Sequence, residues 1–443
     1  MMLWLMDPSM DAAMKNMLTS KYDENPFLMT TIAGKLTPRA IMEAGMRAQT
    51  GKELKRPIGS PVVLSPWEKI LLNPRQLFEL PTENKNQIQT TTIIGPNAKK
   101  PLKLETPIML TGMSYGGSLS LNMKMAIAKG TAIAGTSTNT GEAGLTNEER
   151  DNAKFLIGQY NRAMRMKEED LHQLDAIEIQ FGQGAWGGGS EVTDEAENIG
   201  DHLRETWGLE EGQNSTIYAR FPNTKSSNDI VTIVNRIKDK VDVPVGIKIA
   251  GSDFIEYDLE VISKTNADYI AIDGSEGGTA GAPPTLEDDI GLPTLHSIVR
   301  AVDWLKENNL KDKYQIIAAG GLTTPGHFLK AIALGADAVY IGSIALMATL
   351  QSQMIKALTK YPPPQLALYT GKLKEEFGIE EGAKDLANFL KSCTTEMKGA
   401  LQVLGKNSIR ELNREDLVTL DKDLSEFIGI RYGASKRKNR QEG

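Results

Sequence analysis

Short apolar runs alternate with amphipathic segments along the chain from about residue 101 onward. The runs span 107–113, 134–140, 176–182, 216–220, 245–250, 269–273, 315–320 and 338–342. Such runs are typical of buried strands, and most of the segments between them have the period of a helix. Strands that alternate with helices predict βαβ units and a parallel sheet. Eight units predict an α/β fold, the (β/α)8 TIM barrel, with a doubly wound open sheet as the alternative.

The regions on either side of the predicted barrel have a different pattern. Residues 1–100 lack regular alternation and contain proline-marked turns, so we expect an N-terminal helical extension that packs on the barrel. The barrel itself is expected over 101–362. Residues 363–443 are polar and helical in pattern and end in a run of basic residues. We interpret them as a C-terminal helical segment with a solvated basic tail.

Composition excludes several classes of function. The net charge is −7, which argues against a nucleic-acid partner. The single cysteine, Cys393, cannot form a disulfide framework or a cysteine-ligated metal site, and the four histidines have no metal-binding spacing. We therefore expect no metal. No apolar run approaches about 18 residues, so no membrane span is expected. These features favour a cytoplasmic protein.

The segment 269–283 carries the clearest functional signal. A run rich in isoleucine ends in Asp273 and continues into a loop that contains Gly277, Gly278 and Thr279. Glycines allow the backbone to approach a ligand closely. The ends of the strands are also where parallel α/β proteins have their active sites. The pattern therefore indicates a ligand site at this end of the fold.

A phosphate site is predicted at the ends of the last two runs. Gly320 and Gly321 follow one run, and Gly342 and Ser343 follow the next. Barrels commonly hold a phosphate there with backbone N–H groups and the N-terminus of a short helix. The alternative is that these glycines only form tight turns.

Four polar residues near other strand ends are candidates for chemistry. Lys248 lies within an apolar strand, where it is costly to bury unless it meets an anion or a ligand such as a flavin. The alternative is that it pairs with Asp273. Glu142 either orients substrate and carries protons or is a solvated loop acid. Gln180 and Gln183 bracket the end of the run 176–182, and Gln180, which is polar within that run, either faces a ligand or forms a buried hydrogen bond.

Taken together, the loops resemble the FMN-binding synthase domain of glutamate synthase, particularly its compact archaeal-type form. The matching segments lie at 107–116, 134–142, 182–185, 247–249, 273–281, 320–322 and 336–342. The resemblance implies an FMN-dependent barrel in which ammonia and 2-oxoglutarate form an imine that the reduced flavin converts to glutamate.

The resemblance also implies roles for individual residues. The flavin would be lined by Met113, Ser114, Asn139, Gln180, Gly277, Gly278 and Thr279. Its phosphate would be held by Gly320, Gly321, Gly342 and Ser343. Lys248 would contact the ring, and Glu142 and Gln183 would serve catalysis on the substrate side.

The chain departs from the family pattern at several positions. The cysteines of the family's iron–sulfur cluster are replaced by a segment without cysteine at 345–350, and we expect no glutaminase domain. Trp186 stands where the family has a lysine, and 159–165 has no counterpart of the family's Gly-Arg-Phe-Gly segment. Losing this lysine and arginine weakens the match to a doubly charged 2-oxo acid. Nearby basic residues that could compensate are Arg162, Arg165, Arg220 and Lys225.

Our functional hypothesis is an FMN-dependent oxidoreductase of the glutamate synthase type that acts on CH–NH2 or C=N groups in amino-acid metabolism. It would act on a small-molecule substrate and need a separate electron donor or acceptor, either a protein or NAD(P)H. One alternative is an FMN-dependent non-redox isomerase like type 2 isopentenyl diphosphate isomerase. The other is a flavin-binding subunit without its own turnover. The sequence leaves open whether the chain forms a homo-oligomer.

Overall fold

The computed structural model describes residues 2–186, 188–358 and 360–437, and the chain divides into two compact units, residues 1–55 and 56–443. The N-terminal unit contains three helices, α1 (Met2–Thr19), α2 (Leu28–Leu36) and α3 (Pro38–Thr50). None of the side chains from 10 to 55 is buried. The predicted packing of an N-terminal extension on the barrel stays a prediction.

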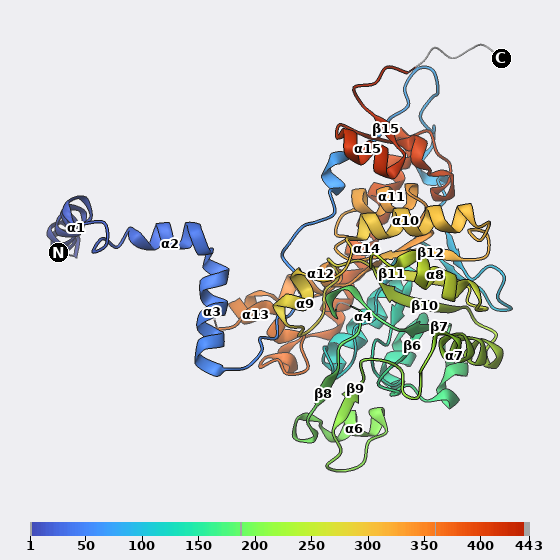
Figure 1. Cartoon of the computed structure of the whole chain (residues 1–443), viewed down its shortest axis with the longest axis horizontal. Helices are drawn as coiled ribbons and strands as arrows, with labels where there is room; N and C mark the ends of the chain where they lie inside the picture. Colours follow the sequence, from blue (N-terminus) through green and yellow to red (C-terminus); the bar gives the residue numbers. More distant parts are fainter. Residues whose placement is uncertain (1, 187, 359, 438–443) are drawn as a thin grey trace. The chain divides into compact units, whose positions relative to one another are not determined.

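The second unit is built on eight parallel strands (Figure 1). In sheet order these are β4 (Ile108–Leu110), β13 (Ala338–Ile341), β12 (Gln315–Ala319), β11 (Tyr269–Asp273), β10 (Val245–Ala250), β7 (Ala176–Gln180), β6 (Phe155–Asn161) and β5 (Ser137–Asn139). The two outermost strands, β4 and β5, are in contact with each other. The sheet is therefore a nearly closed (β/α)8 barrel, which confirms the predicted fold class.

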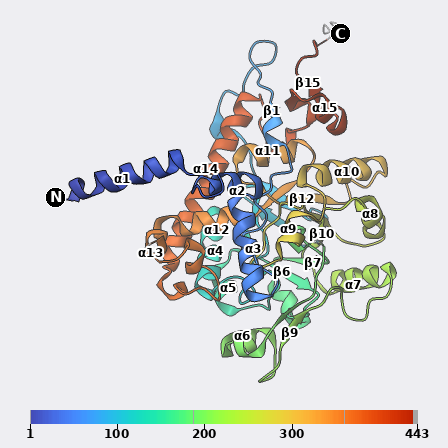
Figure 2. The ribbon, with the colours of Figure 1, turned by 60° about the vertical axis from the view of Figure 1, so that its left-hand side comes forward.

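Helices surround the sheet, as Figure 2 shows for α4, α10 and α11. Their buried apolar residues belong to the same core as those of the strands. The helices that connect barrel strands include α4 (Leu121–Ala134), α7 (Ser227–Lys240), α8 (Ile255–Ser263), α10 (Thr294–Glu307) and α11 (Pro325–Ala333). The short helices are α5 (Asn147–Asn152), α6 (Asp201–Trp207), α9 (Pro284–Asp288), α12 (Ser343–Leu350), α13 (Ile355–Leu358) and α15 (Lys422–Ile428). The long helix α14 (Ile379–Val403) contacts α4 and α12, so the C-terminal segment belongs to the same unit.

A β-hairpin fills the amino-terminal end of the barrel. Its strands, β2 (Thr92–Ile94) and β3 (Leu102–Leu104), pair in antiparallel fashion. Three hairpin side chains form one buried cluster with residues of six barrel strands: Ile94, Leu102 and Leu104 with Met109, Ile157, Ala176, Tyr269, Ala271, Ile317, Ala319, Ala338 and Tyr340. The interior at this end is thus apolar and packed, which leaves the carboxyl ends of the strands for chemistry.

Within the barrel, one predicted strand is wrong and one strand was not predicted. The run 216–220 was expected in the barrel, but β9 (Ser215–Ile217) pairs in antiparallel fashion with β8 (Val192–Asp194) outside it. The third barrel strand is β6, which pairs with β5 and β7. Its inner face carries Gln159 and Asn161, whose polarity interrupts the apolar pattern. An extra three-stranded sheet joins β1 (Ile70–Leu72), β14 (Leu417–Thr419) and β15 (Arg431–Tyr432).

A buried lysine joins β4 to β5, the two strands that share no ladder. The ammonium of Lys124, on α4, donates to the carbonyl oxygens of Met113 and Asn139 at 2.7 Å each. It also forms an ion pair with Glu149 of α5 at 2.8 Å. Both side chains are 1% exposed. Burial raises the pKa of Glu149, although Lys124 opposes that effect.

We predict that Lys124→Met destabilises the protein by about 3–5 kcal/mol, because it leaves the Glu149 carboxylate buried without its partner. Chemical denaturation of the wild type and the variant measures the free energy of unfolding. The matched control is Lys129→Met on the same helix, which removes a solvent-exposed pair with Glu380 and should cost less than about 1 kcal/mol. Equal losses in the two variants would contradict the prediction.

Candidate active site

The residues predicted from sequence for the site lie on the carboxyl-terminal halves of barrel strands or in the loops that follow them. Asn139, Gln180 and Lys248 are strand residues with buried side chains. The others lie in the loops after the strands or, for Ser343, at the start of α12. The structure therefore gathers them at one end of the barrel, as expected for this fold.

Lys248 lies on β10 inside the barrel, and its side chain is 2% exposed. Its ammonium is 3.1 Å from Oδ2 of Asp273 and donates to the hydroxyl of Thr111 at 3.2 Å. Burial acts to lower the pKa of Lys248. Asp273, Glu178 and Glu142 oppose burial and prevail, so the pKa of Lys248 lies above its usual value of 10.5. The site thus holds a positive charge at neutral pH. An ammonium has three hydrogens, and those of Lys248 meet Asp273 and Thr111, which leaves one for a ligand.

Glu178 is a buried acid that the sequence analysis did not single out. It lies on β7 between Ala176 and Gln180, and it is 0% exposed. Its Oε1 accepts hydrogen bonds from Asn139 at 3.1 Å and Gln159 at 2.8 Å. The sequence signal that could have identified Glu178 is an acid between two isoleucines, Ile177 and Ile179. Asn139 therefore has a bracing contact as well as its predicted place near a cofactor.

Gln180 and Gln183 lie next to each other at the end of β7. The amide of Gln180 is 3.4 Å from Oε1 of Gln183. The Oε1 atom of Gln180 is buried and has no hydrogen-bond partner. A buried acceptor without a donor is costly and calls for a ligand or a bound water. The backbone of Gln183 pairs with that of Gly188, which folds the following loop back on itself.

The glycine loop after β11 is covered by residues 56–60. Ile58 donates its backbone N–H to the carbonyl of Thr279 at 2.8 Å and accepts a hydrogen bond from the hydroxyl of Ser343 at 3.0 Å. A side chain on Gly278 would lie 2.5 Å from the carbonyl oxygen of Ile58 and 2.6 Å from Oγ of Ser343. Gly277 turns back on Gly274 through a 2.9 Å backbone hydrogen bond. The sequence analysis did not find this covering segment, because its contacts are separated by more than 200 residues.

The loops after β12 and β13 have the form that a phosphate site requires. Gly320 has φ +106° and Gly321 has φ +65°, conformations that glycine adopts readily. Gly342 precedes α12, and a side chain there would closely approach only Thr111. The first N–H groups of α12 have no partner within the helix, whereas the hydroxyl of Ser343 donates to the Ile58 carbonyl. These features fit an anion.

Glu142 follows β5 and lies among basic groups. Its Oε1 is buried without a hydrogen-bond partner and is 3.9 Å from the guanidinium of Arg162. Its backbone carbonyl accepts a hydrogen bond from Arg165 at 3.0 Å. The interpretation of Glu142 as a fully solvated loop acid therefore does not match its surroundings. Gly141 of the same loop lies against Met113 and Ser114. Lys124 donates to the Met113 carbonyl, and Ser118 and Leu119 donate to the Ser114 carbonyl.

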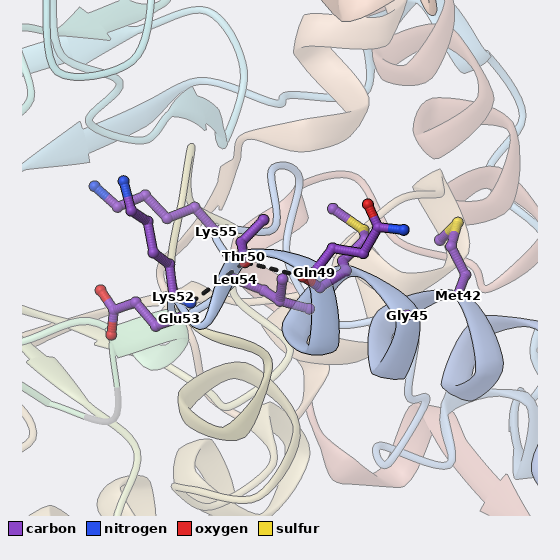
Figure 3. A pocket seen from close by; sticks show the side chains of 9 residues that line it. Met42, Gly45, Gln49, Thr50, Lys52, Glu53, Leu54 and Lys55 are labelled. Atoms are coloured by element: carbon purple, nitrogen blue, oxygen red, sulfur yellow. Dashed lines mark hydrogen bonds between the residues drawn. The ribbon is translucent and has the colours of Figure 1, made fainter.

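Three further observations concern a metal site, a pocket and a membrane span. Among residues 2–186, 188–358 and 360–437, no group of three or more His, Cys, Asp or Glu residues is placed to hold a metal ion. Figure 3 shows a pocket within the N-terminal unit, lined by residues between Met42 and Lys55. That pocket contains none of the predicted site residues. In the described part of the chain, no helix is long and apolar enough to cross a membrane.

Comparisons with known proteins agree with this architecture. A family profile described as a conserved region in glutamate synthase matches residues 67–407. The chain is 30% identical over 417 residues to a glutamate synthase large subunit-like protein of Rhizobium meliloti, covering 89% of this chain and 94% of that protein. It is 35% identical over 348 residues to an archaeal glutamate synthase (NADPH) of Methanocaldococcus jannaschii, covering 77% of this chain and 67% of that protein.

The fold also occurs in solved structures. A mutant flavocytochrome b2 with bound pyruvate has a TM-score of 0.50 and 15% identity, covering 96% of this chain and 94% of that chain. At this identity the likeness concerns the fold alone.

The barrel and the polar groups at the carboxyl ends of its strands define a (β/α)8 enzyme. The chain belongs to the glutamate synthase family, since the profile matches more than half of its length. The predicted family is therefore confirmed. Membership also confirms the predicted class, an FMN-dependent oxidoreductase of the glutamate synthase type.

We predict that Lys248→Met lowers stability by about 3–5 kcal/mol at neutral pH, because three acids lose their shared counter-charge. A lysine with a raised pKa stabilises the fold below its unfolded pKa of 10.5, and that contribution is lost as pH rises through the folded pKa. The stability difference between the wild type and the variant should therefore be constant up to about pH 10 and shrink above it.

Denaturant titrations at a series of pH values measure this difference. Lys264→Met is the control, because Lys264 is exposed and pairs only with Glu260 one turn away. If the stability difference between the wild type and Lys248→Met kept its full size at strongly alkaline pH, the charge of Lys248 would not be its cause.

Proposed function

We propose that the chain holds FMN at the carboxyl end of the barrel and reduces a 2-imino acid, formed from a 2-oxo acid and ammonia or an amine, to an amino acid. The observation that carries the proposal is the buried ammonium of Lys248, held charged by Asp273, Glu178 and Glu142. A permanent cation inside a barrel mouth suits a cofactor that gains negative charge on reduction.

The residues present fit FMN at both ends of the cofactor. The unpartnered Oε1 of Gln180 offers an acceptor for a ring N–H group, and Lys248 has a donor left for a ring oxygen or nitrogen. The backbone around Gly320 and Gly321, the start of α12 and the hydroxyl of Ser343 suit the phosphate. Met113, Ser114, Gly277, Gly278 and Thr279 would line the space between them.

When bound and reduced, FMN supplies a hydride from N5. The chemistry before that step needs only substrate and protein: a 2-oxo acid and ammonia lose water to give a 2-imino acid. The imino acid, protonated on nitrogen by solvent, would then need only a hydride at its imine carbon to become the amino acid. Glu142 would accept a hydrogen bond from the substrate nitrogen, and the amide of Gln183 would orient the substrate. Lys248 holds its proton throughout, because its pKa is raised.

Electrons for this reaction must come from outside the chain. The chain has one cysteine, so it cannot by itself hold a cysteine-ligated cluster to relay them. Relatives named glutamate synthase (NADPH) suggest NADPH as the ultimate donor, reached directly or through a partner protein. We also propose that the protein acts in the cytoplasm, where the electron donor and the 2-oxo acid are both available.

The experiment that tests the proposal is anaerobic reduction of the purified protein followed by reoxidation with 2-oxo acids. We expect one FMN per chain. We also expect the absorbance of oxidised flavin to return only when a 2-oxo acid and ammonia or methylamine are both present, with one amino acid formed per flavin. A protein that binds no flavin would overturn the proposal. Catalysis that needs reduced flavin but consumes no electrons would instead indicate the isomerase alternative.

Replacing the buried lysine gives a second test. Lys248→Met should lower the reduction potential of the bound FMN, because the lysine cation stabilises the anionic reduced ring more than the oxidised ring. It should also change the reduced flavin from the anionic to the neutral form near neutral pH, which the absorbance spectrum reports. An unchanged potential in a folded variant that retains FMN would exclude a role for Lys248 at the ring.

A further inference from the structure

The segment that covers the glycine loop after β11 reaches all three loops expected around the FMN phosphate. It comprises residues 56–65, which we call the strap, and it is the first part of the second compact unit. One end of the strap lies on the loops after β11 and β13, and the other end lies beside the loop after β12. The contacts at these two ends decide what the strap does to a bound cofactor.

The first half of the strap runs alongside the loop after β11. The backbone N–H of Arg56 donates to the carbonyl of Ala282 at 2.9 Å. The N–H of Ile58 donates to the carbonyl of Thr279 at 2.8 Å. The carbonyl of Ile58 in turn accepts a hydrogen bond from the hydroxyl of Ser343, the first residue of α12, at 3.0 Å. The strap therefore ties the loop after β11 to the loop after β13.

Strap and loop touch at a pair of glycines. A side chain on Gly59 would lie 2.6 Å from Cα of Gly278, and a side chain on Gly278 would lie 2.5 Å from the carbonyl oxygen of Ile58. Two backbones come this close only where both residues lack a Cβ atom. A phosphate group cannot pass between Gly59 and Gly278 while the strap is in place.

The far end of the strap is fixed beside the loop after β12. The N–H of Ser65 donates to Oε1 of Glu276 at 2.7 Å, and its hydroxyl accepts from the N–H of Leu295 at 3.1 Å. The other carboxylate oxygen of Glu276 accepts from the N–H and the hydroxyl of Thr294. A side chain on Gly321 would lie 2.7 Å from Cβ of Glu276. This anchor thus borders the third loop of the expected phosphate site.

A charged anchor holds the near end. The guanidinium of Arg56 donates to both carboxylate oxygens of Asp288, at 2.7 and 3.1 Å, and to Glu287 at 3.2 Å. The Arg56 side chain is 15% exposed and that of Glu287 is 0% exposed. The hydroxyl of Ser60 donates to Asp288 as well. A bidentate pair fixes orientation as well as distance, so Arg56 holds the strap in one position.

The closed strap carries backbone strain. Ile58 has φ +79°, a conformation that β-branched residues rarely adopt. Between the two anchors, residues 61–64 are exposed or half-buried. A strained conformation persists only where the surrounding contacts over-determine it. Loss of the Arg56 anchor should therefore open the strap while the barrel stays folded.

We propose that the strap is a gate over the FMN phosphate and that Arg56 is the positioning residue that keeps it closed. Every contact that closes the strap lies within the protein, so closure does not depend on the cofactor. FMN then enters and leaves only during openings, and the gate slows both steps in the same proportion. This inference rests on the proposed place of FMN and deepens it by naming what controls cofactor exchange.

The test measures exchange of bound FMN in Arg56→Met and in a matched control, Arg300→Met. Arg300 also bridges two acids, Asp253 and Glu256, but it joins α10 to the start of α8. Holoprotein is mixed with an excess of isotopically labelled FMN, and mass spectrometry of the bound flavin gives the dissociation rate. Flavin fluorescence on serial dilution gives the Kd, and the two values together give the association rate.

We expect Arg56→Met to raise the dissociation rate about 10- to 100-fold, the loss typical of a charged hydrogen bond. The Kd should stay within about 3-fold, because the association rate rises with it. Arg300→Met should leave both rates within about 2-fold. Arg56→Lys, which keeps the charge but not the planar fork, should give an intermediate rate.

Ser60→Ala is a milder variant that tests the same anchor. It removes one hydrogen bond to Asp288 and should raise the dissociation rate about 3-fold. This variant carries the test if Arg56→Met does not fold.

Hydrogen exchange tests the gate without any measurement of activity. The N–H of Ile58 is protected while it donates to Thr279, so its exchange reports opening of the strap. Arg56→Met should speed exchange in peptides that cover 56–65 and 277–282, and leave β12 and β13 unchanged. Unchanged exchange in the strap would show that Arg56 does not hold it closed, and the gate would be wrong.

The outcomes separate failure of the gate from failure of the proposed function. A dissociation rate and a Kd that rise together in Arg56→Met would show that Arg56 supports the bound cofactor and does not gate it. If neither value changes in a variant that holds FMN, the gate is wrong and the proposed function stands. If the wild type holds FMN and exchanges it as expected, but forms no amino acid from any oxo acid, the gate stands and the proposed chemistry falls. A wild-type protein without FMN would overturn both.

Discussion

The ammonium of Lys124 is the contact on which the barrel and its opening both depend. Strands β4 and β5 share no ladder, so the sheet alone leaves a seam between them. Lys124 closes that seam by donating to the carbonyl oxygens that follow β4 and end β5, and Glu149 neutralises its charge. The same two carbonyls belong to Met113 and Asn139, residues expected beside the flavin. One buried ion pair thus joins β4 to β5 and holds the backbone of two residues that are expected to line the site.

Above this seam, the interior changes from apolar packing to a set of opposed charges. The amino-terminal half is filled by the hairpin β2–β3 and by side chains such as Tyr269 and Ile317. Lys248 and Glu178 lie farther along the strands, buried where water does not screen them. Their interactions are strong in such surroundings, which is why a ligand that adds or removes one charge has a large effect there.

Strands such as β11 and β12 were predicted correctly because both of their faces are largely apolar. Alternation of such runs with helices is enough to predict a barrel, because each run must be covered on its outer face by a helix. Strand β6 escaped prediction because Gln159 and Asn161 face inward, and 216–220 was misassigned because a short apolar run does not reveal which sheet it joins. The loops of the site were predicted together with the strands. Each loop directly follows a strand in the sequence, and the fold brings the strand ends together.

The sequence by itself determined the fold class, the family and the end of the barrel that carries the chemistry, because apolar periodicity and glycine-rich strand ends are local features. Only the tertiary structure decided which charges meet. Arg162 and Arg165 are three residues apart and look alike in sequence, yet one is fully bonded and the other is not. The covering of Gly278 by Ile58 and the place of Glu178 were equally hidden. Pairings of buried polar groups join residues far apart in the chain, and their free energy depends on geometry and burial that no local pattern records.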